Sequence, residues 1–301
     1  MDCEYIEQIG KGVYGEVWKA VCNGENVAVK IFTNPIYAEN YEDWKDEVKI
    51  LEKIMPACKQ YALCMIDKFV KDKKGYIITN FIDGKTFLSM LKEINLDTRK
   101  SNFQPVNDLI HGINLIHQQG VVHQDIKGEN IMFDKSFKYI DFGYSCHKSK
   151  YYECIRRGTE YTMPPDIVND KSPWDQLIAQ DIWSVGILLL RWYQLKWDNK
   201  KRMFIRYSKF EENSLTELVK NIENFGVRAI VGLLLERDWN QRLINFEFVL
   251  KMLKNIDDIS TKTEIDTIKI VDLLITKIYN DHSSIALNNL LPTVQRILNL
   301  H

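Results

Sequence analysis

The stretch Val121-Val122-His123-Gln124-Asp125-Ile126-Lys127-Gly128-Glu129-Asn130-Ile131-Met132-Phe133 decides how the chain is interpreted, together with Asp141-Phe142-Gly143, which begins eleven residues after Asn130. Two carboxylates and a carboxamide grouped in this way suit a divalent cation, because Mg²⁺ prefers oxygen ligands and bridges the phosphates of a substrate. Asp125 is then free to accept a hydroxyl proton. This part of the chain therefore predicts the floor of a phosphate-handling site.

A glycine-rich segment near the amino terminus supplies a second signal. Residues 10–17 read Gly-Lys-Gly-Val-Tyr-Gly-Glu-Val, a G-x-G-x-x-G-x-V pattern between two predicted strands. Glycines let backbone amides approach phosphate oxygens because no Cβ intervenes. The pattern alone also fits an ordinary turn, and it opens no helix, which argues against a dinucleotide fold. The next strand carries Val27-Ala28-Val29-Lys30, so a lysine follows the glycines by one hairpin.

A lysine that contacts phosphates inside a cleft needs an anion to hold it. Glu47 precedes Leu51 by one turn of a predicted helix over residues 40–55, so it lies beside the apolar stripe that faces the sheet. We therefore expect Glu47 to pair with Lys30. The alternatives are the other acids of the same helix, Glu42, Asp43 and Asp46.

Hydrophobic periodicity divides the chain into a β-rich and an α-rich part. Strands are predicted at 5–9, 16–21, 27–32, 64–70 and 76–82, and later helices at 106–117, 182–195, 224–235 and 246–253, with short strands at 131–133 and 138–140. The pattern predicts an α+β fold with a small lobe over about 1–80, a hinge at 80–84 and a helical lobe over 85–256. A tail over 257–301 shows helical spacing, which fits packing on the large lobe or a partner-binding element.

The composition narrows the class of protein. The 301 residues carry a net charge of -1, which gives no electrostatic reason for nucleic-acid binding. The longest uncharged run, residues 109–124, is too short for a membrane span. Neither a signal peptide nor a C-x-x-C pair is found, so we expect the six cysteines to be reduced thiols in an intracellular protein.

Taken together, these motifs resemble the eukaryotic-type protein kinase family over about residues 4–255. The resemblance implies a two-lobed fold, ATP with Mg²⁺ (or Mn²⁺) as cofactors, and phosphoryl transfer to a protein hydroxyl. Asp125 resembles the catalytic base, Asn130 and Asp141 the metal ligands, and Lys127 the lysine of the serine/threonine subclass. Lys30 with Glu47 resembles the ion pair that holds the phosphates.

The resemblance also implies a nucleotide pocket and a segment that seats the acceptor residue. The implied nucleotide contacts are Ile9, Gly10, Gly12, Gly15, Val17, Ala28, Lys30, Thr79, Asn80, Phe81, Ile82 and Met132, with Thr79 at the gatekeeper position. Residues 157–166 resemble the acceptor segment, in which Thr159 would bond Asp125 and Lys127. Residues 181–186 resemble the buried helix that anchors the catalytic loop, and Arg242 would pair with Asp166.

Three positions depart from the family pattern. Gln124 replaces the arginine that normally precedes the base, and an uncharged amide cannot form the ion pair that clamps a phosphorylated activation segment. Pro164 and Asp166 replace the usual alanine and glutamate. Activity should therefore not depend on that clamp, and the positioning of a peptide is the least certain part of the comparison.

The sequence thus predicts an active serine/threonine protein kinase. The alternatives are a nucleotide-binding pseudokinase that regulates a partner and a kinase of small molecules. The expected partners are a protein substrate and, through the tail, another protein or a second copy, with no nucleic acid and no membrane span. The expected location is the cytoplasm, which would be the host cytoplasm for a virus or intracellular pathogen.

Overall fold

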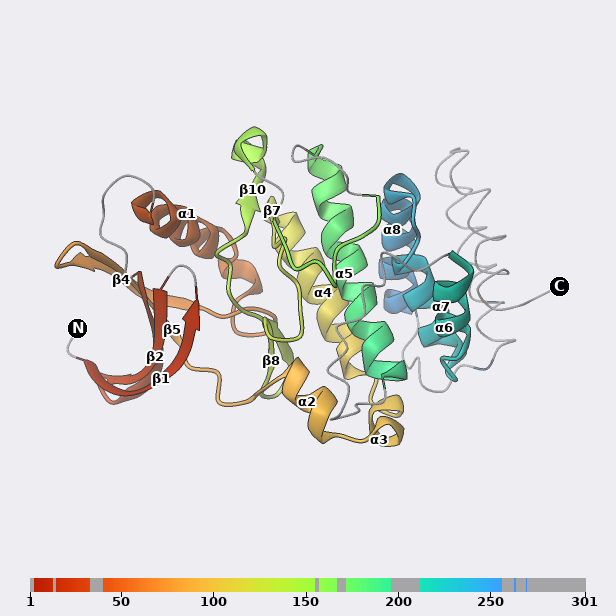
Figure 1. Cartoon of the computed structure of the whole chain (residues 1–301), viewed down its shortest axis with the longest axis horizontal. Coiled ribbons are helices and arrows are strands. Elements are labelled where there is room, and N and C mark those ends of the chain that lie inside the picture. Colours follow the sequence, from red (N-terminus) through yellow and green to blue (C-terminus); the bar gives the residue numbers. More distant parts are fainter. Residues whose placement is uncertain are drawn as a thin grey trace.

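The computed structural model describes residues 3–12, 15–32, 40–154, 157–166, 172–195 and 212–255, and the single positions 263 and 269. A β-sheet lobe at the amino-terminal end adjoins a larger helical lobe (Figure 1). The predicted α+β, two-lobed fold is confirmed. The predicted helices of the tail lie outside the described residues.

The small lobe is an antiparallel sheet of five strands in the order β1-β2-β3-β5-β4. The strands are β1 (Cys3–Gly12), β2 (Gly15–Cys22), β3 (Glu25–Phe32), β4 (Met65–Lys71) and β5 (Lys74–Asn80). The predicted hairpin turn at Asn23 and Gly24 has positive φ angles at both residues, 53° and 84°, as a tight two-residue turn between twisted strands requires. Helix α1 (Asn40–Lys53) packs on this sheet, where the Trp44 indole donates a hydrogen bond to the Tyr76 carbonyl at 3.2 Å.

The large lobe is built on two central helices, α4 (Gln104–Gln118) and α5 (Trp174–Gln194). The other helices are α2 (Phe87–Glu93), α3 (Leu96–Lys100), α6 (Glu212–Lys220), α7 (Phe225–Leu234) and α8 (Trp239–Asn255), with 3₁₀ turns η1 (Met55–Ala57) and η2 (Lys148–Glu153). Short strands complete it: β6 (Lys85–Thr86), β7 (Val121–Val122), β8 (Ile131–Phe133), β9 (Phe137–Tyr139) and β10 (Cys146–His147).

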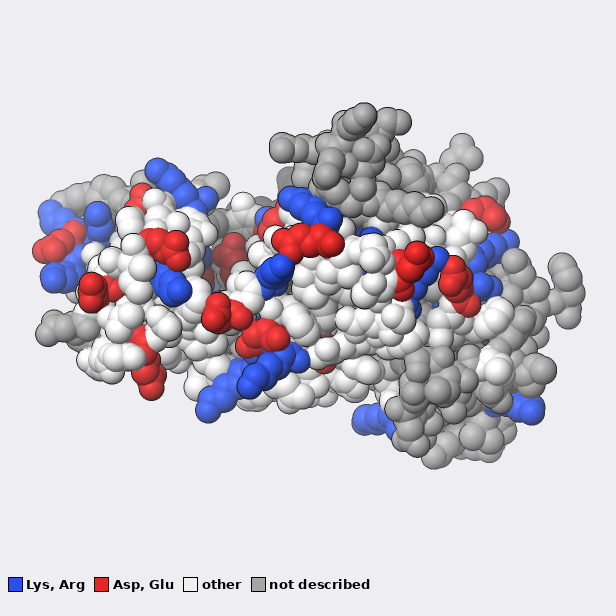
Figure 2. Space-filling model, turned by 90° about the horizontal axis from the view of Figure 1, so that it is seen from below, with Lys and Arg blue, Asp and Glu red and all other residues white. Residues whose placement is uncertain are grey.

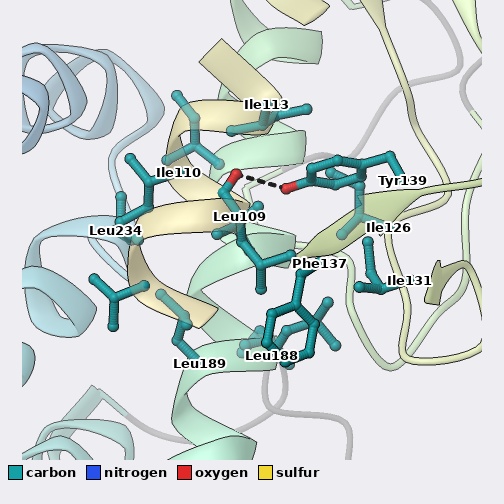
Figure 3. Packing of buried hydrophobic residues seen from close by; sticks show 14 of the residues in the cluster. Leu109, Ile110, Ile113, Ile126, Ile131, Phe137, Tyr139, Leu188, Leu189 and Leu234 are labelled. Atoms are coloured by element: carbon teal, nitrogen blue, oxygen red, sulfur yellow. Dashed lines mark hydrogen bonds between the residues drawn. The ribbon is translucent and has the colours of Figure 1, made fainter. Parts of the chain in front are cut away.

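The core of the large lobe joins α4 and α5 to the short strands near the predicted site. Leu109 and Ile113 of α4, Leu188 of α5 and Phe137 of β9 are fully buried together (Figure 3). The Tyr139 hydroxyl crosses this core and donates a hydrogen bond to the Leu109 carbonyl at 2.8 Å. Because β8 directly follows Asn130 and β9 ends two residues before Asp141, this packing fixes the floor of the cleft.

A buried arginine closes the carboxyl-terminal end of α5. Arg99 is 1 % exposed, and its guanidinium donates to the carbonyls of Arg191, Trp192 and Leu195 in the last turn and C-cap of α5. Burial lowers the pKa of Arg99 to about 10. The guanidinium therefore ties α3 to the end of the central helix.

The cysteines differ from the sequence expectation. All six lie among the described residues and form three disulfides, Cys3–Cys22, Cys58–Cys64 and Cys146–Cys154. The expectation of reduced thiols is therefore wrong for this structure. Scattered spacing did not reveal the pairs because hairpins and turns bring their members together.

The surface carries both signs of charge. On the face shown in Figure 2, acidic and basic side chains are interspersed among uncharged ones. Within the described ranges, no helix combines the length and hydropathy needed to span a membrane.

Candidate active site

A cavity of about 750 Å³ lies between the sheet and the large lobe. Every residue predicted to contact a nucleotide lines it: Ile9, Gly10, Gly12, Gly15, Val17, Ala28, Lys30, Thr79, Asn80, Phe81, Ile82 and Met132. Glu47, Asp125, Lys127, Asn130 and Asp141 line it as well. The fold thus brings motifs that are more than a hundred residues apart to one cleft.

Lys30 stands at the centre of a charge cluster in this cleft. Its Nζ lies 2.8 and 2.7 Å from the two carboxylate oxygens of Glu47 and 3.2 Å from Oδ1 of Asp141. Glu47 is 6 % exposed, whereas the rival Asp46 is about half exposed and pairs with Lys49. The predicted choice of Glu47 as the partner of Lys30 is therefore borne out by these distances.

Burial and pairing act in opposite directions on this cluster. Burial disfavours the charged ammonium, yet the two carboxylates outweigh it and raise the pKa of Lys30. Burial also raises the pKa of Glu47, and Lys30 offsets this only in part. For Asp141 the order is reversed: burial pushes its pKa upward, but the charge and hydrogen bond of Lys30 hold it below the ordinary value. The cluster therefore presents a fixed ammonium and an ionised Asp141.

The catalytic-loop candidates form a second cluster around Asp125. This carboxylate accepts hydrogen bonds from the Thr159 hydroxyl at 2.6 Å, Lys127 Nζ at 2.7 Å and Asn130 Nδ2 at 3.0 Å. Lys127 Nζ also lies 3.3 Å from the Thr159 hydroxyl oxygen. The expected contacts of Thr159 with both residues are thus present, although Thr159 itself does not line the cavity.

Asp181, at the predicted anchoring helix, holds the backbone of this loop. Its carboxylate accepts from the backbone N–H groups of His123 at 2.7 Å and Gln124 at 2.8 Å, and contacts the His117 ring at 3.0 Å. Gln124 has a φ of 65°, an unusual value for a residue with a side chain. The buried carboxylate therefore stabilises the turn that presents Asp125.

Asn130 and Asp141 have the chemistry of a magnesium site. The Asn130 side chain uses its NH₂ group on Asp125, which leaves its oxygen as the atom suited to a hard cation. Asp141 is ionised and half exposed. One carboxylate and one amide oxygen fit Mg²⁺, which normally completes its shell with water and substrate phosphates.

Comparison with known proteins agrees with this geometry. Residues 3–252 match the sequence profile of the protein kinase domain. The chain belongs to this family. It is 25 % identical over 229 residues to "Serine/threonine-protein kinase 10" of Danio rerio, covering 71 % of this chain and 23 % of that protein.

Other relatives are of the same kind. The kinase domain is 27 % identical over 259 residues to "Serine/threonine-protein kinase dst1" of Dictyostelium discoideum, covering 81 % of this chain and 34 % of the relative. It is 26 % identical over 219 residues to "Calcium/calmodulin-dependent protein kinase cmkA" of Emericella nidulans, covering 70 % and 49 %. The chain thus spans less than half the length of these relatives.

The glycine-rich segment of this kinase has two kinds of glycine. A Cβ at Gly15, whose φ is +151°, would lie 1.9 Å from the Ile31 carbonyl oxygen, whereas a Cβ at Gly12 would meet nothing within 4 Å. Gly15 is therefore required by the close approach of β2 to β3, and Gly12 keeps space open over the cleft. Val13 and Tyr14 lie outside the described residues.

The hinge is tied to a disulfide-closed loop that the sequence did not reveal. The Asn80 N–H donates to the Cys64 carbonyl at 3.0 Å, and its side-chain oxygen accepts from the Cys64 N–H at 2.6 Å. The same loop exchanges backbone hydrogen bonds with the large lobe, from Leu63 to Tyr139 at 3.2 Å and from Tyr139 to Tyr61 at 2.8 Å. We call residues 58–64 the disulfide strap.

The acceptor-segment candidates are anchored by Arg242, as expected. This fully buried guanidinium lies 3.1 Å from both carboxylate oxygens of Asp166 and donates to the carbonyls of Ala179, Glu236 and Arg237. The shorter side chain of Asp166 therefore still reaches the arginine.

Several residues of the site were not anticipated. Apolar lining comes from Leu51, Leu63, Ile77 and Ile140, none of which was predicted to contact a nucleotide. Tyr161 donates its hydroxyl to the Glu129 carboxylate at 3.0 and 3.2 Å. Ile140 could have been found from the sequence, because it directly precedes Asp141. No feature of the sequence pointed to the contact between Tyr161 and Glu129.

Proposed function

We propose that this chain is an active serine/threonine protein kinase that transfers the terminal phosphoryl group of ATP, with Mg²⁺, to a protein hydroxyl. The observation that carries the proposal is the arrangement of one cleft. Lys30 is fixed between Glu47 and Asp141 on one side, and Asp125 lies with Lys127, Asn130 and Thr159 on the other. A chain that had lost catalysis would have no need of both clusters.

Each side chain has a role that follows from its charge. Asn130 and Asp141 would hold the metal, which supplies positive charge to the phosphates of the bound nucleotide. Lys30 would bind phosphate oxygens without moving, because its carboxylate partners already fix it. Asp125 would orient the acceptor hydroxyl and take its proton. Lys127, which contacts Asp125 and Thr159, would stabilise the charge that develops on the transferred group.

Two features support a protein hydroxyl as the acceptor rather than a small metabolite. The acceptor segment lies beside the catalytic loop: Thr159 bonds Asp125, and the Arg242–Asp166 pair anchors the other end. A segment held in this way is suited to seat a peptide chain. Lys127 stands two residues after the base, the arrangement of the serine/threonine subclass. The tail and its possible role as a partner-binding element stay a prediction.

The decisive experiment is phosphoryl transfer by the purified chain. We expect the wild-type protein, given labelled ATP and Mg²⁺, to label serine and threonine residues of a generic panel of unstructured and basic proteins. Asp141→Ala should abolish labelling while far-UV circular dichroism and the melting temperature stay near wild type. Phosphoamino-acid analysis then distinguishes serine and threonine from tyrosine.

The same assay separates the alternatives. A pseudokinase would bind ATP in a thermal-shift assay yet label nothing, with or without a metal. A small-molecule kinase would consume ATP with choline or aminoglycosides and leave the protein panel unlabelled. Labelling by the purified Asp141→Ala chain at the wild-type level would contradict the assigned site.

A further inference from the structure

Gln124 contacts two places in the longer activation segment, residues 141–166, whose last part is the acceptor segment. Its Nε2 donates to the Tyr144 carbonyl at 3.0 Å, and its Oε1 accepts from the Arg157 N–H at 3.3 Å. Tyr144 directly follows Gly143, whereas Arg157 lies two residues before Thr159. One buried amide, 3 % exposed, therefore joins the beginning of the segment to the part that reaches Asp125.

A second buried amide reinforces the first. Gln180 of α5 donates from Nε2 to the Gln124 carbonyl at 3.1 Å and to the Arg157 carbonyl at 2.9 Å. Gly158 fits against this junction, because a Cβ there would lie 2.5 Å from the Gln124 carbonyl oxygen. These bonds satisfy backbone groups at Tyr144 and Arg157 with neutral side chains.

The Cys146–Cys154 disulfide closes the loop between Tyr144 and Arg157, the two residues whose backbone Gln124 contacts. The two Cα atoms lie 6.0 Å apart, a normal span for a disulfide. Cys146 pairs with Val122 through the ladder of β10 with β7, and Lys148 N–H donates to the Gly120 carbonyl at 2.8 Å, so one end of the closed loop is fixed on the large lobe. The covalent link passes this restraint on to Cys154, three residues before Arg157.

We infer that Gln124 is a positioning residue for the acceptor segment and that the Cys146–Cys154 disulfide completes its restraint, so that the oxidised kinase holds Thr159 beside Asp125 with no phosphate on the segment. The inference rests on the proposed function. Gln124 acts through Arg157 and Thr159 and does not contact the reacting atoms. Reduction of the disulfide removes the covalent part of the restraint and weakens acceptor binding.

The chemistry of the switch is thiol–disulfide exchange. A dithiol reductant transfers two electrons and two protons, the S–S bond breaks, two thiols form at Cys146 and Cys154, and the reductant becomes the disulfide. Both cysteines are only partly buried, so a small thiol can approach them. Where disulfides do occur in reducing compartments, they are commonly redox-sensing.

The first test separates acceptor binding from nucleotide binding. Gln124→Leu keeps the size of the side chain but removes both hydrogen bonds, and we expect the peptide KM to rise about tenfold with the KM for ATP unchanged. Gln124→Glu keeps the acceptor for the Arg157 N–H and should fall between Gln124→Leu and wild type. Wild-type enzyme treated with a phosphatase, and shown by intact mass to carry no phosphate, should keep its peptide KM.

The second test is reduction. Dithiothreitol should raise the peptide KM of the wild-type kinase several-fold and leave the KM for ATP unchanged. Cys146→Ser/Cys154→Ser should show the raised peptide KM without reductant and no further response to it, whereas the matched Cys3→Ser/Cys22→Ser variant should respond like wild type. If the first double variant does not fold, alkylation mapped by mass spectrometry on wild type follows the loss of the 146–154 bond against the KM.

The outcomes are separable from failure of the proposed function. Labelling of protein that Asp141→Ala abolishes establishes the activity, whatever these variants do. The inference is overturned if Gln124→Leu leaves the peptide KM unchanged, or if it raises the KM for the peptide and the KM for ATP together, as partial unfolding would. It is also overturned if the peptide KM of Cys146→Ser/Cys154→Ser still responds to dithiothreitol.

Discussion

The nucleotide side and the acceptor side of the cleft are held by different interactions. On the nucleotide side, Lys30 is fixed by the charges of Glu47 and Asp141. On the acceptor side, the neutral amides of Gln124 and Gln180 and a disulfide hold the chain that leads to Thr159, and the Arg242–Asp166 ion pair anchors the far end of the segment. The nucleotide side matches the family motifs, whereas the acceptor side contains the departures from them. We infer that one kinase domain can keep a charge-based site for the nucleotide while its acceptor segment is organised without phosphate.

The largest expected effect lies on the nucleotide side. Lys30→Met should lower kcat about 10²- to 10³-fold, the size of effect seen when one preorganised electrostatic contact is removed from a transition state. Labelling rates at saturating ATP measure it. The matched control is Lys19→Met, because Lys19 packs over the Phe81 ring at the edge of the same cleft and forms no ion pair with any residue that the structure describes. Equal losses in the two variants would contradict the role of Lys30.

The next effect concerns the anchor of the acceptor side. Arg242→Met should reduce the free energy of unfolding by about 3 kcal/mol or more, because it leaves Asp166 and several carbonyls without their buried partner. Urea denaturation followed by tryptophan fluorescence measures the change. Lys220→Ala removes an exposed i,i+3 pair with Glu217 and should cost about 0.5 kcal/mol or less. A small effect of Arg242→Met would show that the acceptor side does not depend on this charge.

The smallest effect is a pH dependence confined to the nucleotide side. The pKa of Glu47 lies above the ordinary 4.5 and that of Asp141 lies below 3.8, so acid protonates Glu47 first and weakens its hold on Lys30. We expect ATP affinity to decline several-fold as the pH falls toward and through the pKa of Glu47.

Stability should follow a different course over the same range. Because the folded state raises the pKa of Glu47, protonation of this group favours folding, and the stability that Asp141 contributes is lost only when the pH falls through its depressed pKa. The melting temperature should therefore not follow the loss of affinity. Glu47→Gln should remove the decline of ATP affinity at low pH. Isothermal titration of an ATP analogue at several pH values would test this. If the affinity of Glu47→Gln still declines at low pH, the decline is due to titration of the nucleotide or of another group, and the role of Glu47 is contradicted.

The sequence predicted the charged side well because its contacts follow from motifs. The glycine pattern, the Lys30 strand and the Asp125 loop each carry residues whose chemistry suits contact with phosphates or a metal ion. Helical spacing alone distinguished Glu47 from Asp46. Helix α4 and the second half of α5 were also predicted, since their apolar pattern extends over several turns, whereas the first two turns of α5 were not.

The remaining features depend on tertiary contacts that spacing does not encode. Strands of two residues, such as β7 and β10, have no periodicity and exist because their neighbours pair with them. The Cys146–Cys154 disulfide depends in the same way on the 3₁₀ turn η2, which brings Cys154 back to Cys146. The substitution at Gln124 was visible, but the choice of Tyr144 and Arg157 as its partners was set by the path of the segment.

The disulfide strap, residues 58–64, has a consequence for motion of the two lobes. It is bonded to Asn80 on one side and to Tyr139 on the other, so the rear of the cleft is fastened to both halves. We therefore expect the lobes to rock about this fastening with little sliding, so that nucleotide would enter and leave at the rim formed by Gly10 and Gly12.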